Sequence, residues 1–179
     1  IIHVLRCFDN DNITHVDGSV DPVRDKEIID IELQLKDLES LNNRIEKVKR
    51  TAKSGDKEAI HEKEILQKAI EFIESSNNIR SIELDTLEID KYLKPLQLIT
   101  SKPVLYVCNV DENCINSTNH YVESVKSLIS KEGANLIVLA AGIESEINEL
   151  DDYEERRMFL DDLGLDVPGS SKLINATYD

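Results

Sequence analysis

Aromatic residues, cysteines and long apolar runs are scarce in this sequence. Its 179 residues include no tryptophan, three phenylalanines and three cysteines. A core with few large aromatic side chains must be filled mainly by Leu and Ile, which favours helices with a modest sheet. The unclustered Cys7, Cys108 and Cys114 argue against a disulfide framework or a zinc site, and we predict no metal site. No apolar run reaches about 18 residues and no signal peptide is visible, so we expect a cytoplasmic protein without membrane contact.

Positive charge is scarce as well. The sequence has 36 acidic and 21 basic residues, for a net charge of −15. Proteins that bind nucleic acids usually carry a basic patch, and here only short Lys/Arg clusters occur, on predicted helices. We therefore expect no strong direct nucleic-acid binding by this acidic chain. Ten Asp and Glu accompany only Arg156 and Arg157 in residues 143–166, which is typical of a solvated acidic surface.

Three short apolar segments predict the strands of a parallel sheet. Buried parallel strands read as continuous apolar runs, and such runs occur at 1–8, 104–108 and 136–140. A predicted helix at 121–131 separates the last two, so strand, helix and strand form a βαβ unit. An acidic helix is expected at 151–162. The predicted fold class is therefore α/β.

The intervening residues predict a helical hairpin. Apolar side chains recur at steps of three and four from about residue 25 to 50, as one helical stripe. They are Ile28, Ile31, Leu35, Leu38, Leu41, Ile45 and Val48. A break at Gly55 is followed by a second stripe from 59 to 73, so an antiparallel pair of helices is expected. A third helix should begin at Asp85, with Glu88 as the acid of a capping box.

These elements predict a helical domain inserted into an α/β domain. We expect residues 1–21 and 99–179 to form the α/β domain. Residues 22–98 would form the antiparallel helical, coiled-coil-like insertion between two strands of its sheet.

A candidate site follows the second predicted strand, at Asn109-Val110-Asp111-Glu112. Ligands of α/β proteins bind beyond the carboxyl ends of the strands, and GTPase-like folds read the nucleotide base there with Asn-Lys-x-Asp. Their Asp accepts hydrogen bonds from guanine N1–H and the 2-amino group, donors that adenine lacks on that edge. Glu112 is one methylene longer than that Asp, whereas Asn109 can bond either purine. The pattern favours adenine and leaves guanine open; an ordinary Asn/Asp turn is the alternative interpretation.

The sequence resembles the YchF/Obg-like ATPases, a branch of the translation-factor-related (TRAFAC) P-loop NTPases, along nearly all of its length. The segments that carry this resemblance are His3-Val4-Leu5-Arg6-Cys7-Phe8, Ile13-Thr14-His15-Val16-Asp17-Gly18, Val20-Asp21-Pro22, Thr100-Ser101-Lys102-Pro103, Asn109-Val110-Asp111-Glu112, Ala140-Ala141 and Glu149-Leu150-Asp151-Asp152.

The resemblance implies a G domain with an inserted helical domain, ATP as the preferred nucleotide and GTP as a possible one. Phe8 and Val110 would lie against the two faces of the adenine. Ala140 and Ala141 would approach the base with backbone groups, as in the last GTPase loop. His15 is implied as the catalytic residue, since a neutral imidazole can orient or deprotonate the attacking water. A surface-loop histidine without a catalytic role is the alternative.

Two family motifs are missing from the sequence. It contains neither G-x-x-x-x-G-K-S/T, which cradles the phosphates and supplies a Mg²⁺ ligand, nor Asp-x-Ala-Gly. The resemblance places these motifs before Ile1 and a ubiquitin-like TGS domain after Asp179. We therefore expect the middle part of a longer, ribosome-associated ATPase that uses ATP and Mg²⁺, inactive by itself because phosphoryl transfer depends on the phosphate and metal contacts.

Two other functions remain open at this stage. The chain could be a nucleotide-independent protein-interaction module built on the helical hairpin. It could also belong to a GTPase proper, although Val110 and Glu112 disfavour this.

Overall fold

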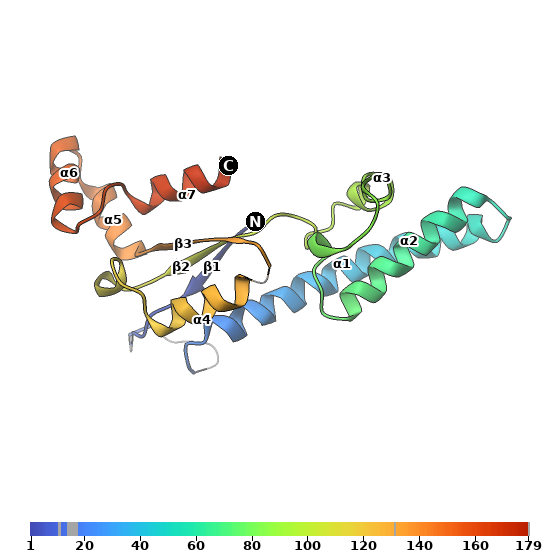
Figure 1. Cartoon of the computed structure of the whole chain (residues 1–179), viewed down its shortest axis with the longest axis horizontal. Helices are drawn as coiled ribbons and strands as arrows, with labels where there is room; N and C mark the ends of the chain where they lie inside the picture. The colour runs from blue at the N-terminus through green and yellow to red at the C-terminus, as the bar shows by residue number, and fades with distance from the viewer. Residues whose placement is uncertain (11, 14–17, 131, 179) are drawn as a thin grey trace. The chain divides into compact units, whose positions relative to one another are not determined.

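The chain forms two compact units in a computed structural model that describes residues 1–10, 12–13, 18–130 and 132–178 (Figure 1). The first, here called the sheet unit, contains Ile1–Lys26 and Val104–Asp179. The second, the helical unit, contains Glu27–Pro103. No helix within the described ranges is long and apolar enough to cross a membrane.

The sheet unit is built on three parallel strands in the order β1 (Ile2–Arg6), β2 (Leu105–Asn109) and β3 (Asn135–Leu139). This confirms the predicted α/β class with a parallel sheet. The first four residues of the central strand β2 are buried, as its continuous apolar sequence predicts. The register aligns Arg6 with Asn109 and Asn109 with Leu139. The three strands therefore end together, and the loops that follow them meet at one edge of the sheet.

Four helices complete the sheet unit, together with a short 3-10 turn, η4 (Glu112–Cys114). They are α4 (His120–Ile129), α5 (Ala141–Glu149), α6 (Tyr153–Asp162) and α7 (Gly169–Tyr178). The core combines apolar side chains of the strands with those of the helices: Leu5, Cys7, Tyr106, Cys108, Val110, Val122, Val125, Ile129, Ala140, Ile143, Ile147, Leu160 and Leu165.

The acidic residues 143–166 supply helix caps as well as a charged surface. The Glu144 carboxylate in α5 accepts hydrogen bonds from the backbone N–H groups of Gly169 and Ser170, at 2.6 and 2.9 Å. These groups belong to the first turn of α7, where a carboxylate is favourable. A Cβ atom at position 169 would lie 2.8 Å from the Glu144 carboxylate and 2.9 Å from the Leu139 side chain, so the cap requires a glycine there.

The helical unit contains most of α1 (Pro22–Ala52) and all of α2 (Lys57–Glu74), which runs back beside α1 (Figure 1). The Asp56 side chain accepts from the Ala59 N–H and begins α2. Four short segments follow in the order η1 (Ile79–Ser81), α3 (Thr86–Glu88), the π-helical η2 (Ile89–Leu93) and the 3-10 helix η3 (Lys94–Leu96), before the chain reaches β2. Asp85 caps α3, as predicted, by accepting from the Leu87 N–H.

The apolar stripe of α1 is buried over only part of its length. Leu41, Ile45 and Val48 belong to a core shared with α2 residues such as Leu66. The stripe residues nearer the start of the helix are exposed, Ile28 by 42%, Ile31 by 52% and Leu35 by 60%. Periodicity therefore predicted the helix and its packing against α2 correctly, and predicted too much burial for the first half of α1.

A buried carboxylate anchors the end of the helical unit to α1. Asp37 is 1% exposed and accepts three hydrogen bonds, each of 2.7 Å, from the Ile99 N–H, the Thr100 N–H and the Thr100 hydroxyl. Thr100 Oγ1 in turn accepts from the Ile79 N–H at 3.2 Å. This network satisfies a charge that would otherwise be costly to bury.

Candidate functional site

A cavity of about 460 Å³ opens at the edge of the sheet where the three strands end. Its walls come from the loop after each strand: Phe8, Asp9, Asn10, Ile13, Asn109, Val110, Asp111, Glu112, Asn113, Ala140, Ala141 and Gly142. Six of the seven predicted site residues are among them, namely Phe8, Asn109, Val110, Glu112, Ala140 and Ala141. The seventh, His15, lies outside the described residues. The structure thus brings together in one cavity residues that are more than 130 positions apart in the sequence.

Asn109 connects two walls of the cavity. It is the last residue of β2, and its Oδ1 accepts a hydrogen bond from the Ala141 N–H at 2.9 Å. Because Ala141 can only donate, this contact fixes which end of the amide is oxygen. The Nδ2 group is then the side chain's remaining donor. Asn109 also serves as the cap of α5, since Ala140 at the N-cap position offers no side-chain acceptor.

Val110 and Ala140 line the cavity mainly through their backbones. Their side chains belong to the core and are 3% and 1% exposed. The Val110 N–H donates to the Leu139 carbonyl at 2.9 Å, which extends the pairing of β2 and β3 by one residue. The predicted packing of Val110 on a base face stays a prediction, and only a small part of this side chain is accessible for it.

The two neighbouring carboxylates, Asp111 and Glu112, have different environments. The Asp111 side chain accepts from the Cys114 N–H at 3.0 Å and caps η4, so it has a structural partner. Glu112 is exposed, and its Oε1 is close to Gly142, where a Cβ atom would lie 3.9 Å from it. Glu112 is therefore the carboxylate of the tetrapeptide that remains available to a ligand, beside the first turn of α5.

Arg6 organises the loop that carries Phe8. Its guanidinium donates to three backbone carbonyls, from Nε to Phe8 at 3.1 Å, from Nη1 to Ile13 at 3.0 Å and from Nη2 to Asn10 at 3.2 Å. The same group lies over the Phe8 ring, 4.9 Å from its centroid. The planar fork of arginine suits this arrangement. Arg6 thus covers one face of the Phe8 ring and fixes the loop around the cavity.

Sequence reasoning gave Arg6 no role. The sequence did offer one signal of that role, a single arginine at the end of an otherwise apolar strand. An ionised side chain at such a position needs several hydrogen-bond acceptors nearby. Carbonyl groups of a loop are acceptors that no side-chain pattern in a sequence reveals.

Helix α4 holds the same loop from its other side. Asn119 Nδ2 donates to the Cys7 carbonyl at 2.7 Å, while its Oδ1 accepts from the Val122 N–H. The Tyr121 hydroxyl donates to the Asp9 carboxylate at 2.9 and 3.1 Å. This hydrogen bond, followed by desolvation, raises the pKa of the Tyr121 phenol. The wall that presents Phe8 is therefore held in place by both β1 and α4.

The charge of the cavity indicates which part of a ligand it suits. Its lining, as far as the structure describes it, includes the carboxylates of Asp9, Asp111 and Glu112 but neither lysine nor arginine. Such a wall repels phosphates and accepts an uncharged heterocycle with hydrogen-bonding groups. Among the described residues, no group of three or more His, Cys, Asp or Glu side chains is arranged to hold a metal ion.

No protein-family model matches the chain, but its relatives among known proteins agree with one another in name. The ribosome-binding ATPase YchF of Bacillus subtilis (strain 168) is 47% identical over 180 residues, covering 99% of this chain and 49% of that protein. The ribosome-binding ATPase YchF of Haemophilus influenzae is 43% identical over 176 residues, covering 98% of this chain and 48% of that protein. The solved structure of the Schizosaccharomyces pombe YchF GTPase superposes with a TM-score of 0.86 at 28% identity, covering 99% of this chain and 48% of that one.

Over its 179 residues, this is a YchF-family chain. The resemblance inferred from short motifs is thereby confirmed. The chain spans about half the length of the YchF proteins that it matches. Because the matches cover at least 98% of the chain, the YchF likeness includes both units and the loops around the cavity.

Proposed function

We propose that the cavity binds the purine base of a nucleotide, with ATP preferred over GTP, and that the chain forms the base-binding part of a YchF-type ATPase that associates with ribosomes. The observation that carries this proposal is the single cavity lined by Phe8, Asn109, Glu112 and Ala141, in which the Asn109 amide is already oriented. The relatives' names, ribosome-binding ATPase and GTPase, support a purine nucleoside triphosphate.

The hydrogen-bonding capacity of Asn109 suits a purine. With Oδ1 accepting from Ala141, the Nδ2 group can donate to N7 of the base, and the second lone pair of Oδ1 can accept from the 6-amino group of adenine. Guanine would use its O6 as a second acceptor for Nδ2. The exposed Glu112 can turn to solvent when adenine is bound, because adenine has no donor on that edge. The face of Phe8 that Arg6 leaves open can stack on the ring.

The phosphates require residues outside this cavity. The described residues of its lining include no lysine or arginine, and the sequence has no P-loop motif, so we propose that a P-loop of the longer parent protein binds the triphosphate and supplies the Mg²⁺ contact. The chain by itself would then bind ATP weakly and not hydrolyse it. His15 remains our candidate for orienting the attacking water in the intact protein. Residues 22–98 would be its inserted helical domain, and a cytoplasmic location follows from ribosome association.

The test is a nucleotide titration of this chain and of the full-length parent protein. We expect slow ATP turnover by the parent and none by the 179-residue chain. Asn109→Ala in the parent should weaken ATP binding about tenfold, the equivalent of one hydrogen bond of roughly 1 kcal/mol and its desolvation. The matched control is Asn43→Ala, which removes an exposed amide on α1 and should change nothing.

Two results would overturn the proposal. Strong turnover by the 179-residue chain would show that the phosphate contacts lie within it. Partner binding by the parent that ignores both ATP and Asn109→Ala would instead support a nucleotide-independent interaction module.

A further inference from the structure

One carboxylate of the cavity in the sheet unit is held in place although the base contact does not use it. Asp9 follows Phe8 in the loop after β1, and the Tyr121 hydroxyl of α4 donates to its two oxygens at 2.9 and 3.1 Å. A carboxylate offers about four lone-pair sites, and a single hydroxyl hydrogen leaves most of them free. Because Asp9 is exposed, these sites can accept hydrogen bonds from a ligand in the cavity.

The charge of Asp9 is not neutralised by a neighbouring cation. No lysine or arginine forms an ion pair with it within the part of the chain that the structure describes. Its partner is a neutral phenol, since hydrogen bonding to Asp9 raises the pKa of Tyr121 and keeps this hydroxyl a donor at neutral pH. Tyr121 thus fixes the position of the carboxylate and leaves its charge intact.

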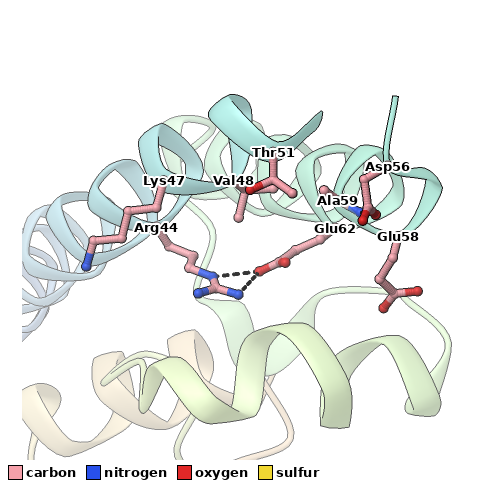
Figure 2. A pocket seen from close by; sticks show the side chains of 8 residues that line it. All are labelled: Arg44, Lys47, Val48, Thr51, Asp56, Glu58, Ala59 and Glu62. Atoms are coloured by element: carbon pink, nitrogen blue, oxygen red, sulfur yellow. Dashed lines mark hydrogen bonds and ion pairs between the residues drawn. The ribbon is translucent and has the colours of Figure 1, made fainter. Parts of the chain in front are cut away.

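A hollow on the helical unit shows the contrasting case (Figure 2). There the Arg44 guanidinium lies against Glu62, with Nε and Nη2 both 2.6 Å from Glu62 Oε1. The Glu62 side chain is only 12% exposed and has a cation as its partner. Glu62 is therefore satisfied within the fold, whereas Asp9 retains its charge and its acceptor capacity at a cavity wall.

The order of the strands indicates which part of a nucleotide would face Asp9. Strand β2 lies between β1 and β3, so the loops after β1 and β3 lie on opposite sides of Asn109. In the proposed base contact Asn109 faces N7 and the 6-substituent, and the N1 edge points to the side of Glu112 and α5. The ribose is attached at N9, at the opposite end of the purine from N1. It is therefore directed to the β1 side, where the loop carries Asp9.

The other side chains of this wall suit a sugar as well. Asn10 is committed to the loop, because its Oδ1 accepts from the Asn12 N–H at 2.9 Å and its carbonyl accepts from Arg6 Nη2. Ile13 is 49% exposed and offers an apolar surface for the carbon atoms of a ribose. Within the described part of this wall, Asp9 is therefore the strongest acceptor for hydroxyl groups.

We propose that Asp9 binds the ribose hydroxyls of the nucleotide and that Tyr121 positions its carboxylate, so that the site selects ribonucleotides over deoxyribonucleotides. The inference rests on the proposed purine site and names the contact for a second part of the same ligand. Hydroxyl groups donate short, charge-assisted hydrogen bonds to a carboxylate, and dinucleotide-binding folds use an acidic residue for a ribose hydroxyl in the same way. Tyr121 does not touch the ligand in this account and acts only through Asp9.

The experiment is a calorimetric titration of ATP, 2′-deoxy-ATP and 3′-deoxy-ATP, each with Mg²⁺, into the full-length parent protein. Asp9→Ala removes the acceptor, and Tyr121→Phe removes only the hydroxyl that holds it. The matched controls are Asp161→Ala and Tyr178→Phe, which remove an exposed carboxylate and an exposed hydroxyl elsewhere in the sheet unit. Thermal unfolding verifies that every variant folds.

The readout is the ratio of the Kd of a deoxy analogue to the Kd of ATP. In the wild type we expect at least one analogue to bind about fivefold more weakly than ATP, a modest loss because water can replace the missing hydroxyl at an exposed carboxylate. The analogue with the loss identifies the hydroxyl that is bound. Asp9→Ala should lower the ratio to about one and Tyr121→Phe to about two, while both controls keep the wild-type ratio. Removal of the Asp9 charge also changes the repulsion of the triphosphate, but this acts on ATP and its analogues alike and cancels in the ratio.

Equal affinities of the wild type for ATP and both analogues would overturn the inference. An unchanged ratio in Asp9→Ala would overturn it too, since a residue that only shapes the loop weakens all three nucleotides equally. The outcome for the purine site is separate and comes from CTP. A protein that binds ATP and CTP equally but prefers the ribose forms would refute the purine site and support the Asp9 contact, and a preference for ATP over CTP without any preference between sugars would do the reverse.

Discussion

Asn109 carries two functions that a pair of substitutions can separate. Its Oδ1 accepts from the Ala141 N–H at 2.9 Å, and its Nδ2 is the donor proposed for the base. Asn109→Ala removes both groups. Asn109→Asp keeps an acceptor for Ala141 and replaces the donor with a second acceptor.

The structure sets the expected magnitudes. Asn109→Ala leaves the first turn of α5 without its cap, which costs about 1 kcal/mol and lowers Tm by roughly 2–4 °C. Asn109→Asp places a negative charge at the N-terminus of α5, worth about 0.3–1 kcal/mol, which the nearby Glu112 partly offsets. We therefore expect a Tm near that of the wild type. For ATP affinity we expect the opposite order of the two variants, with Asn109→Asp the weaker binder. A carboxylate that faces the N7 lone pair costs about 2–3 kcal/mol, which weakens ATP binding about 30- to 150-fold, whereas Asn109→Ala weakens it about tenfold.

The assay combines thermal unfolding with equilibrium titration of a fluorescent ATP analogue into the full-length protein. Opposite orders of the two variants in Tm and in affinity would support a direct base contact. If affinity instead follows Tm, or if Asn109→Asp binds ATP like the wild type, then Asn109 only shapes the loop and the reasoning is refuted.

Three further substitutions test other contacts. Arg6→Met removes the fork that holds the Phe8 loop and should weaken ATP binding about tenfold, with Arg6→Lys intermediate; unchanged titrations would contradict this role. Asp37→Asn places an amide N–H group opposite backbone N–H groups in a buried site, where two donors face each other. Urea unfolding should show that the helical unit loses about 2–4 kcal/mol of unfolding free energy, while nucleotide affinity stays unchanged. Hydrogen bonding to Lys91 lowers the pKa of the Glu58 carboxyl. The ionised carboxylate therefore stabilises the fold at neutral pH, and this stabilisation is lost as pH falls below about 4. Glu58→Gln should reduce the acid dependence of Tm in that range.

The elements predicted best from the sequence are those with strong local patterns. The continuous apolar run before Asn109 identified β2 and the point where it ends, because burial on both faces leaves no polar position within a strand. The regular apolar spacing of α1 likewise identified a long helix. What the pattern could not tell is which part of the stripe has a partner: Leu41 is buried, whereas Leu35 is exposed.

Other features depend on contacts between distant segments. Helix α5 was not predicted, because its apolar positions are few among many acids and its cap comes from Asn109 on another strand. The role of Arg6 was missed because its acceptors are loop carbonyls. The cavity residues Phe8 and Glu112 were predicted through family resemblance and motif, and their proximity follows from the parallel register of the strands.

The most direct test of the base site compares nucleotides that differ only in the base. ATP and CTP carry the same triphosphate, so the ratio of their Kd values in the full-length protein reports the base contacts alone. We expect ATP to bind at least tenfold more tightly than CTP, and Asn109→Asp to abolish most of that preference. Equal affinities for ATP and CTP in the wild-type protein would contradict the assignment of this cavity to a purine.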